Sequence, residues 1–429
     1  MWPDNLTVLD RNYRAGLWIS LAIVRRACRC ILSRCGCYRF ARKPRGRARK
    51  PIESSGMKMN AAVLWDVHED WSVEEIDLDG PADGEVLVSY EATGLCHSDH
   101  HVRAGDLPLT LPIVGGHEGA GIVQEVGPGV RNLNVGDHVV GMFLPACGRC
   151  RWCSTGHQNL CDLSAEMAAG GQLDGSYRRH AKGRDIGALS WLGTFAQYGT
   201  VPESSLVKID DDLPLNRACL VGCGVTTGWG SAVNTADVTP GDTVVVIGCG
   251  GIGSAAIQGA RLAGAEKIIA VDIVEGKRDK VFQFGATHFA TSLPEATALV
   301  TELTRGVMAD SALVTVGLIE APMIVDALNI IRKGGAVVLT ALASMVDMTP
   351  SLPMAVVAMF TLYQKRLLGS LYGAGNPRAD IPRLLSLYRQ GKLLLDETVT
   401  TEYKLADIND AYDDMLAGRN IRGVIVHDH

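Results

Sequence analysis

The segment TVVVIGCGGIGSAAIQGARLAGAEKIIAVD, residues 243–272, decides the fold of this 429-residue chain. Its pattern is typical of a buried strand, a glycine turn, an amphipathic helix and a second strand. The pattern G-x-G-x-x-G follows the apolar strand directly and opens the helix, which is the context that a dinucleotide-binding turn requires. In such a turn the first glycine makes the tight bend, the second lets the backbone approach a pyrophosphate, and the third lets helix and strand pack closely. The turn residues that we expect to contact the ligand are Gly248, Gly250, Gly251, Ile252 and Gly253. A glycine-rich turn without a ligand is the alternative interpretation.

An acidic residue at the end of the second strand indicates which dinucleotide binds. Asp272 follows Gly253 by nineteen residues. A carboxylate at this place accepts hydrogen bonds from the adenosine ribose and repels a 2'-phosphate, so NAD is favoured over NADP. Lys277 is a second candidate for holding the same ribose.

Strand-like and helical patterns alternate over residues 227–370. The strand-like runs in this range are VVVIG, KIIAVD, SALVTV and AVVLT, and helical segments separate them. Such alternation is typical of an α/β fold with a doubly wound parallel sheet, the Rossmann domain. We therefore predict the cofactor-binding domain over 227–370.

Four cysteines lie close together in the run CGRCRWCSTGHQNLC. They are Cys147, Cys150, Cys153 and Cys161, with the spacing C-x2-C-x2-C-x7-C. Four thiolates can surround one tetrahedral ion and favour zinc in a closed, structural site. Free or disulfide-bonded loop cysteines are the alternative. Because a closed site leaves no open position for chemistry, a catalytic zinc must be sought elsewhere.

Residues on either side of this cluster offer a second zinc site. Cys96 lies in GLCHSDHH, His117 in GGHEGAG, and Cys223 in CLVGCGVTTGWG. Two thiolates and one imidazole are a known ligand set for catalytic zinc, with a fourth position open to water or substrate. Taken singly, the two cysteines are equally well explained as small buried hydrophobic residues, and the histidine as an ordinary loop residue.

These motifs, together with AVDI and the closing NIRGVIV, occur in one collinear order from about Met57 to His429. In this respect the chain resembles the zinc-dependent medium-chain alcohol dehydrogenases. The amino-acid sequence of these motifs is also similar to that of the actinobacterial branch whose members use nitrosoaniline-type acceptors. The resemblance implies a GroES-like, β-rich catalytic domain over residues 57–226 with both zinc sites, and a segment 371–429 that returns to it. It also implies two Zn²⁺ per chain, NAD, an alcohol or aldehyde substrate, and a dimer or tetramer.

The resemblance further implies roles for single residues. Cys96, His117 and Cys223 correspond to the catalytic zinc ligands, Asp99 to a carboxylate that orients the histidine, and Glu118 to a glutamate behind the zinc that ligates it transiently. Further correspondences place Ser98 and His101 in a proton relay, Phe143 at the wall of the substrate pocket, Thr227 at the nicotinamide and Arg422 at the pyrophosphate. His97 departs from the family pattern, because many members carry arginine there.

The implied reaction transfers a hydride between a primary alcohol or its aldehyde and NAD. The alcohol proton is expected to pass to Ser98, across the nicotinamide ribose, and on to His101 at the surface, since histidine ordinarily titrates near neutrality. A solvated histidine without function is the alternative for His101. Other possible functions are oxidation of a thiol adduct of formaldehyde, a nicotinoprotein that keeps NAD bound, and a non-catalytic NAD-binding protein.

Composition is that of a globular enzyme. Hydrophobic residues make up 47% and charged residues 21% of the chain. A formal net charge of −6 gives no reason to expect nucleic-acid binding. The sequence contains no run of roughly 18 apolar residues, so it does not indicate a membrane span. Because the zinc ligands must stay reduced, we expect a cytoplasmic protein.

The first 56 residues differ from the rest. They hold eleven arginines and two lysines against three acidic residues, with four cysteines in CRCILSRCGC. The order of charge and apolar residues is the reverse of a secretory signal. We expect this extension to lie outside the fold, with Met57 or Met59 as a natural beginning; a basic tail or a loose metal site is the alternative.

Overall fold

The computed structural model describes residues 56–344, 353 and 355–429. Apart from Gly56, the predictions for the basic N-terminal extension therefore lie outside the described residues. The described residues from Gly56 onward belong to one compact unit, which contains every predicted site residue. Its first strand, β1, begins at Met57.

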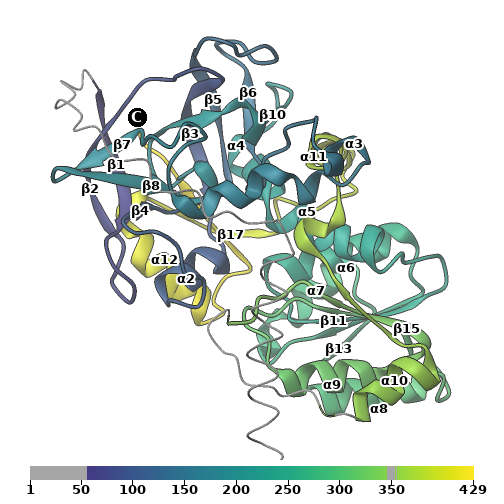
Figure 1. Cartoon of the computed structure of the whole chain (residues 1–429). Helices are drawn as coiled ribbons and strands as arrows, with labels where there is room; N and C mark the ends of the chain where they lie inside the picture. The colour runs from purple at the N-terminus through teal and green to yellow at the C-terminus, as the bar shows by residue number, and fades with distance from the viewer. Residues whose placement is uncertain (1–55, 345–352, 354) are drawn as a thin grey trace, which may run out of the picture. The chain divides into compact units, whose positions relative to one another are not determined.

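A six-stranded parallel sheet forms one part of the described chain, which confirms the predicted doubly wound fold (Figure 1). The strand order is β13-β12-β11-β14-β15-β16, so the order reverses between β11 and β14. Such a reversal is where α/β sheets bind ligands, at the carboxyl ends of the strands. The strands are β11 (Thr243–Ile247), β12 (Lys267–Val271), β13 (His288–Ala290), β14 (Ala309–Val314), β15 (Ile331–Leu339) and β16 (Arg366–Gly369).

Helices cover both faces of this sheet because its strands are apolar on both sides. Val244 and Val246 of β11 pack in a core with α6 and α7, whereas Val245 and Ile247 point into a second core with α8, α9 and α10. In Figure 1 the latter three helices lie together along one face of the sheet. The helices are α6 (Gly251–Ala263), α7 (Arg278–Phe284), α8 (Leu293–Leu303), α9 (Ala321–Ile330) and α10 (Ala355–Tyr363).

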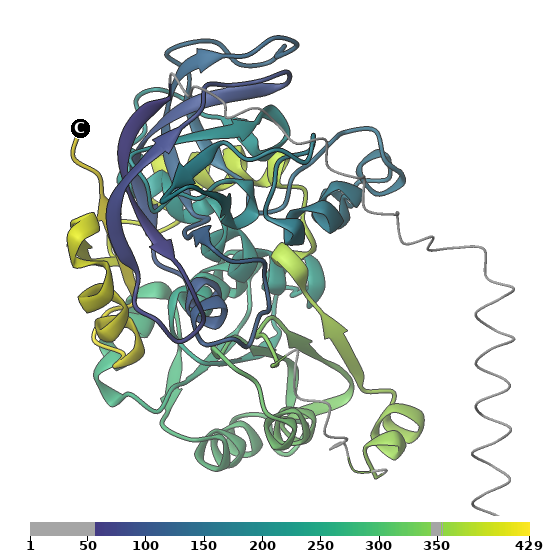
Figure 2. The ribbon, with the colours of Figure 1, turned by 60° about the vertical axis from the view of Figure 1, so that its left-hand side comes forward.

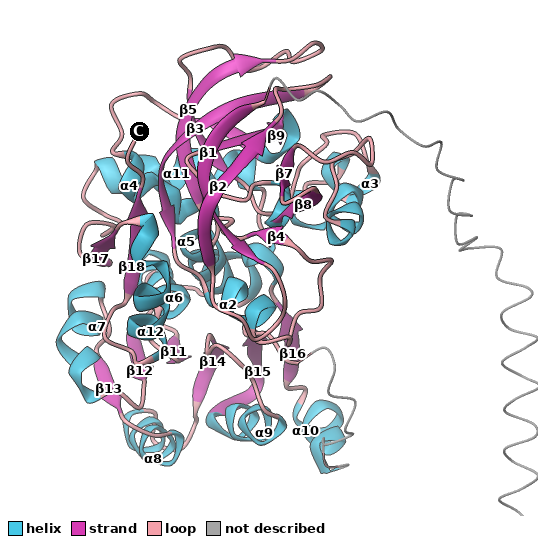
Figure 3. Cartoon of the chain, turned by 90° about the vertical axis from the view of Figure 1, so that its left-hand side faces the viewer, coloured by secondary structure: helices cyan, strands magenta, loops and turns pink. Residues whose placement is uncertain are grey.

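The remaining strands form a β-rich part with a small closed barrel and a seven-stranded sheet (Figure 3). The barrel runs β1 (Met57–Leu64), β2 (Ser72–Leu78), β7 (Arg179–Ala181), β8 (Arg184–Ala188) and β4 (Ile113–Val114). The sheet runs β10 (Leu206–Lys208), β6 (His138–Gly141), β5 (Gly119–Val126), β3 (Glu85–Gly94), β18 (Arg422–Val426) and β17 (Val399–Tyr403), with β9 (Tyr198–Pro202) also paired to β3.

The C-terminal segment returns to these early strands. Strand β18 pairs antiparallel with β3, although the two are more than three hundred residues apart in sequence. Helix α12 (Ile408–Leu416) places Tyr412 against Trp71, with stacked rings 6.2 Å apart. Figure 2 shows the yellow C-terminal segment beside the purple first strands. The return brings Arg422, the first residue of β18, into the interior.

Short helices lie between the strands, and some predicted site residues lie within them or directly before them. The helices are α2 (His97–Arg103), α3 (Arg151–Ser154), α4 (Leu215–Ala218) and α5 (Gly224–Gly230). The helix expected in IPRLLSLYRQGKLLL is α11 (Pro377–Arg389), and Gly391 follows it with φ +67°, which agrees with its predicted role as a helix stop. Among the described residues, no helix is both long and apolar enough to cross a bilayer.

His427, directly after β18, should make stability depend on pH. Burial lowers the pKa of its imidazole to about 4, and Nε2 lies 3.0 Å from the carbonyl oxygen of Thr194. A histidine whose folded pKa lies below its unfolded value of about 6.5 binds fewer protons when folded, so stability falls as the pH drops from about 6.5 to 4.

We therefore expect His427→Gln, whose amide can still donate to Thr194, to flatten this acid-side loss. Between about pH 6.5 and 4, the free energy of unfolding of the wild type should fall by up to about 3 kcal/mol more than that of the variant. The free energy of unfolding, measured by urea denaturation at several pH values, checks this. Parallel pH profiles for the two proteins would contradict the assignment.

Candidate active site

Four buried side chains from three separate segments meet at one point. Cys96 precedes α2, His117 and Glu118 lie between β4 and β5, and Cys223 precedes α5. One ligand atom from each lies within 4.8 Å of the others. The structure thus brings together all three predicted ligands of the second zinc site and adds the Glu118 carboxylate to them.

The donor set fits a zinc ion. Asp99 is fully buried on α2; its Oδ1 accepts a hydrogen bond from the Gly116 N–H at 2.7 Å, and its Oδ2 lies 3.1 Å from His117 Nδ1. This contact places the Nδ1 proton toward the carboxylate and leaves Nε2 free as a metal ligand. A hydrogen bond from Cys223 lowers the pKa of the Cys96 thiol well below its ordinary range. Zinc binds the thiolate form that this favours.

Glu118 is paired with Arg422 in the interior. Its Oε2 accepts from the Arg422 guanidinium, and its Oε1 accepts from the Gly224 N–H at 3.2 Å. The same guanidinium donates to the Leu95 carbonyl at 3.0 Å. Burial raises the pKa of the Glu118 carboxyl to about 7, while Arg422 acts in the opposite direction.

Three glycines leave the space that Arg422 occupies. A Cβ on Gly251 would lie 2.2 Å from Arg422 Cδ, and one on Gly224 would lie 2.4 Å from its Nη1. A Cβ on Gly94 would lie 2.7 Å from Arg422 Nη2 and would also meet Glu118 Oε2. Since Gly251 opens α6, the arginine stem lies at the helix N-terminus, where a pyrophosphate is expected. Its predicted pyrophosphate contact stays a prediction.

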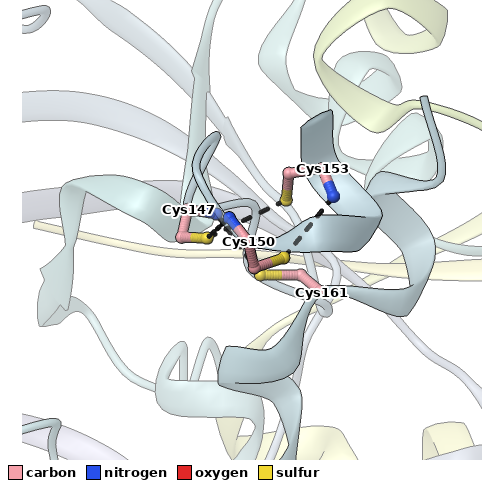
Figure 4. A group of neighbouring side chains, drawn as sticks. All are labelled: Cys147, Cys150, Cys153 and Cys161. Carbon is pink, nitrogen blue, oxygen red and sulfur yellow. Dashed lines mark hydrogen bonds between the residues drawn. The ribbon is translucent and has the colours of Figure 1, made fainter. Parts of the chain in front are cut away.

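The other cluster is formed by the four closely spaced cysteines (Figure 4). The sulfur atoms of Cys147, Cys150, Cys153 and Cys161 lie within 4.8 Å of one another, and all four are free thiols. Backbone N–H groups point at the sulfurs, as at Cys150, whose N–H lies 3.3 Å from Cys147 Sγ. The backbone N–H of Cys153 lowers the pKa of the Cys150 thiol to about 6. This geometry fits a four-thiolate structural zinc.

A cavity of about 780 Å³ joins the zinc-type cluster to the glycine turn. Cys96, Ser98 and Glu118 line one part of it. The residues after the sheet strands line another part, among them the turn Gly248–Ile252 after β11 and the segment Thr315–Gly317 after β14. The cavity therefore lies at the carboxyl ends of the strands where their order reverses.

The predicted cofactor residues gather along this cavity. The turn leaves Gly250 with no atom within 4 Å of a would-be Cβ, so the cavity is open to the backbone there, whereas at Gly253 the Cβ would lie 1.9 Å from Gly248 O. Asp272 accepts from the Cys249 N–H at 2.7 Å and from Lys277 Nζ at 2.9 Å. Asp272 and Lys277 both line the cavity.

The position of His101 corrects one expectation. The side chain lines the cavity but is only 7% exposed, so His101 does not lie at the surface as expected, and its place in a proton relay stays a prediction. Nε2 lies 3.0 Å from the Gly317 carbonyl oxygen and Nδ1 lies 3.2 Å from Asp106 Oδ2. Helix α2 turns this residue inward, which a surface interpretation of the polar run CHSDHH did not foresee. Ser98 lines the same cavity, with Oγ 3.6 Å from Cys96 Sγ.

Phe143 and Thr227 lie outside the set of residues that line the cavity. The Phe143 ring packs edge-on against His117, 5.8 Å away, and lies 4.4 Å from the Tyr372 ring. Thr227 is buried in α5. The substrate-wall and nicotinamide roles of these two residues remain predictions.

Several residues at the site were not found by sequence reasoning. Tyr412 donates to the Cys96 carbonyl at 3.3 Å, and Asp106 pairs with His101. The pairing of Arg422 with Glu118 also links residues about three hundred positions apart. No local sequence pattern indicates the contacts of Tyr412 or of Arg422. The pair Gly105-Asp106, shortly after α2, is a local signal for the turn that brings Asp106 to His101.

Comparison with known proteins agrees with this geometry. Residues 82–211 match the family model described as alcohol dehydrogenase GroES-like domain, and residues 251–390 match the one described as zinc-binding dehydrogenase. Alcohol dehydrogenase B of Mycobacterium tuberculosis is 52% identical over 86% of this chain and 98% of its own length. The NDMA-dependent alcohol dehydrogenase of Amycolatopsis methanolica is also 52% identical, over 86% of this chain and 99% of its own.

A solved structure shows the same architecture. The alcohol dehydrogenase zinc-binding domain protein of Burkholderia ambifaria superimposes with a TM-score of 0.81 at 32% identity, over 87% of this chain and 100% of that one. The two zinc-type clusters, the cavity at the glycine turn and these similarities lead to one conclusion: the chain belongs to the zinc-dependent medium-chain alcohol dehydrogenases, and is an oxidoreductase of that family.

Proposed function

We propose that this protein transfers a hydride between a primary alcohol, or its aldehyde, and NAD at the cavity described above. The observation that carries the proposal is the shared cavity, because Cys96 and Glu118 line it together with the glycine turn Gly248–Ile252. Hydride transfer needs the reacting carbon and the nicotinamide in contact, and a cavity that joins the two sites provides this proximity. In domain terms, residues 57–226 and 371–429 form the catalytic domain and 227–370 the cofactor domain.

The side chains have separable tasks in this reaction. Zinc bound at Cys96, His117 and Cys223 would supply a Lewis acid for the substrate oxygen. Asp99 orients the His117 ring, and all members of the cluster are buried. When NAD is bound, Ser98 would accept the proton from the substrate hydroxyl and His101 would take up a proton at the far end of the path. Both side chains line the cavity.

Asp272 supports NAD as the dinucleotide. Its carboxylate is held by the Cys249 N–H and by Lys277, and it lines the cavity where the adenosine ribose is expected. A 2'-phosphate would meet this fixed negative charge, so NADP is disfavoured.

A second candidate keeps NAD permanently bound and regenerates it with an external acceptor. The name of the 52% identical relative from Amycolatopsis, which includes dependence on NDMA, favours it. Under this candidate the protein as purified contains about one NAD per chain after extensive dialysis, and a nitrosoaniline acceptor supports turnover. If instead the dialysed protein holds no nicotinamide and added NAD restores turnover, the cofactor dissociates. Quantifying nicotinamide released by acid denaturation decides between the two.

Two buried cysteines four residues apart provide a test of the catalytic zinc. Cys223 belongs to the ligand cluster, whereas Cys219 is also buried but lies outside it. We expect Cys223→Ala to lower zinc content from two to one per chain and to abolish nearly all alcohol-dependent turnover, because a catalytic metal loses a thiolate ligand. Zinc measured by mass spectrometry and initial rates of alcohol oxidation check this.

The matched variant Cys219→Ala should keep both zinc ions and most of the activity. Loss of zinc in neither variant, or equal loss in both, would contradict the assignment of Cys223 as a ligand.

Substitutions at two glycines of the turn distinguish an effect on cofactor binding from an effect on stability. At Gly253 an added Cβ meets the Gly248 carbonyl, so Gly253→Ala should cost about 1–3 kcal/mol of stability. At Gly250 it meets no protein atom, so Gly250→Ala should change stability by less than about 0.5 kcal/mol but hinder the approach of the pyrophosphate. Thermal unfolding and NAD binding by calorimetry check both variants. Unchanged NAD affinity in Gly250→Ala would exclude the turn as the pyrophosphate site.

A further inference from the structure

Asp106 lies next to His101 because of the way helix α2 ends. The last turn closes through hydrogen bonds from the Ala104 N–H to the His100 carbonyl and from the Gly105 N–H to the Val102 carbonyl. Gly105 has φ +80°, a left-handed conformation that glycine adopts without strain. The chain then reverses, and the Leu107 N–H donates to the His101 carbonyl at 3.1 Å. This turn brings Asp106 back onto the ring of the histidine five residues earlier.

The imidazole is held at both nitrogens. Asp106 Oδ2 lies 3.2 Å from Nδ1, and the Gly317 carbonyl oxygen lies 3.0 Å from Nε2. Both partners are hydrogen-bond acceptors, so the full pair of contacts suits a ring that carries both protons. When the ring is neutral, the carboxylate retains the proton on Nδ1, because a carboxylate binds an N–H more strongly than a neutral carbonyl does. The Nε2 lone pair then faces the Gly317 carbonyl oxygen at the edge of the cavity, and a proton taken up by Nε2 can be donated to this oxygen.

Asp106 is the carboxylate that pairs with the His101 ring. Among the ion pairs of residues 56–344 and 355–429, His101 is the one cationic partner of Asp106. The other titratable groups that face the ring are His97 and His100 on α2, with ring centroids 6.5 and 6.1 Å away. From the cofactor side, the loop after β14 presents the Gly317 carbonyl, and Asp326 of α9 lines the same cavity.

We propose that Asp106 is a positioning residue of the proton path, which fixes the Nδ1–H tautomer of His101 and stabilises the imidazolium formed when Nε2 accepts the substrate proton. The inference rests on the proposed function, in which His101 receives that proton. In the step itself the proton released by the substrate hydroxyl would be balanced by one proton taken up at His101 Nε2, Ser98 would end with the proton it began with, and Asp106 would stay ionised. The arrangement places a carboxylate behind a histidine base, as in other enzymes that use histidine for proton transfer.

The kinetic test replaces Asp106 and a matched carboxylate. Asp106→Asn should lower kcat/KM for alcohol oxidation roughly ten- to a hundredfold at neutral pH. The acid limb of its kcat/KM profile should move to lower pH, since the imidazolium loses its carboxylate. Asp70→Asn is the control, because Asp70 pairs with Arg103 of the same helix without contacting His101. It should leave rate and profile unchanged, and Asp106→Glu should restore part of the rate.

A double-mutant cycle separates this role from a structural one. In a His101→Gln background, Asp106→Asn should cause no further loss, because its effect acts through the imidazole. Equal losses in both backgrounds, or a wild-type profile for Asp106→Asn, would overturn the proposal.

A readout without turnover keeps the proposal testable if the proposed function fails. Nitrogen NMR of ¹⁵N-histidine protein, with His101 assigned through His101→Gln, reports which ring nitrogen carries the proton at alkaline pH. We expect Nδ1–H in the wild type and a shift toward Nε2–H in Asp106→Asn. An Nε2–H tautomer in the wild type would overturn the proposal whatever the activity. A wild type with the Nδ1–H tautomer but without alcohol oxidation would instead contradict the proposed function.

Discussion

One buried ion pair, between Arg422 and Glu118, ties the parts of this active site together. Arg422 comes from the last strand, Glu118 lies beside a zinc-type ligand, and the arginine stem rests on Gly251 at the start of the cofactor-binding helix. The two side chains are 5% and 0% exposed. Removing one partner of such a buried pair leaves an unpaired charge at a cost of about 3–5 kcal/mol. The pair therefore constrains the C-terminal segment to return to the early strands, and it requires glycine where the arginine passes.

The zinc-type ligand cluster and the glycine turn lie at one cavity, and a different feature of the fold positions each of them. The glycine turn sits at the carboxyl end of β11, where the strand order of the parallel sheet reverses. The thiol, imidazole and carboxylate groups are presented by short segments before α2, before β5 and before α5. The four-cysteine cluster is a separate, closed site and shapes the loop that carries it. One cavity reaches both the turn and the ligand cluster.

Features with a local signature could be predicted from the sequence. The parallel sheet follows from apolar runs and glycine spacing, and the four-cysteine cluster from close spacing of thiols. The scattered ligands Cys96, His117 and Cys223 had no single local pattern to unite them, so their residue chemistry suggested the group and the family resemblance supported it. The contact of Arg422 with Glu118 could not be predicted, because the two residues are far apart in sequence and no local pattern links them. The burial of His101 was missed because the polar run around it resembles a solvated loop, whereas α2 turns this ring inward.

The proposed function requires that hydride pass from an alcohol carbon to NAD within this cavity. The most direct measurement is stopped-flow absorbance of reduced nicotinamide after mixing the zinc-loaded full chain and NAD with a primary alcohol, either unlabelled or deuterated at the reacting carbon. The account predicts formation of NADH in the first turnover and a slower rate with the deuterated alcohol. No reduced nicotinamide across a panel of primary alcohols, from protein that holds two zinc ions per chain and bound NAD, would contradict it.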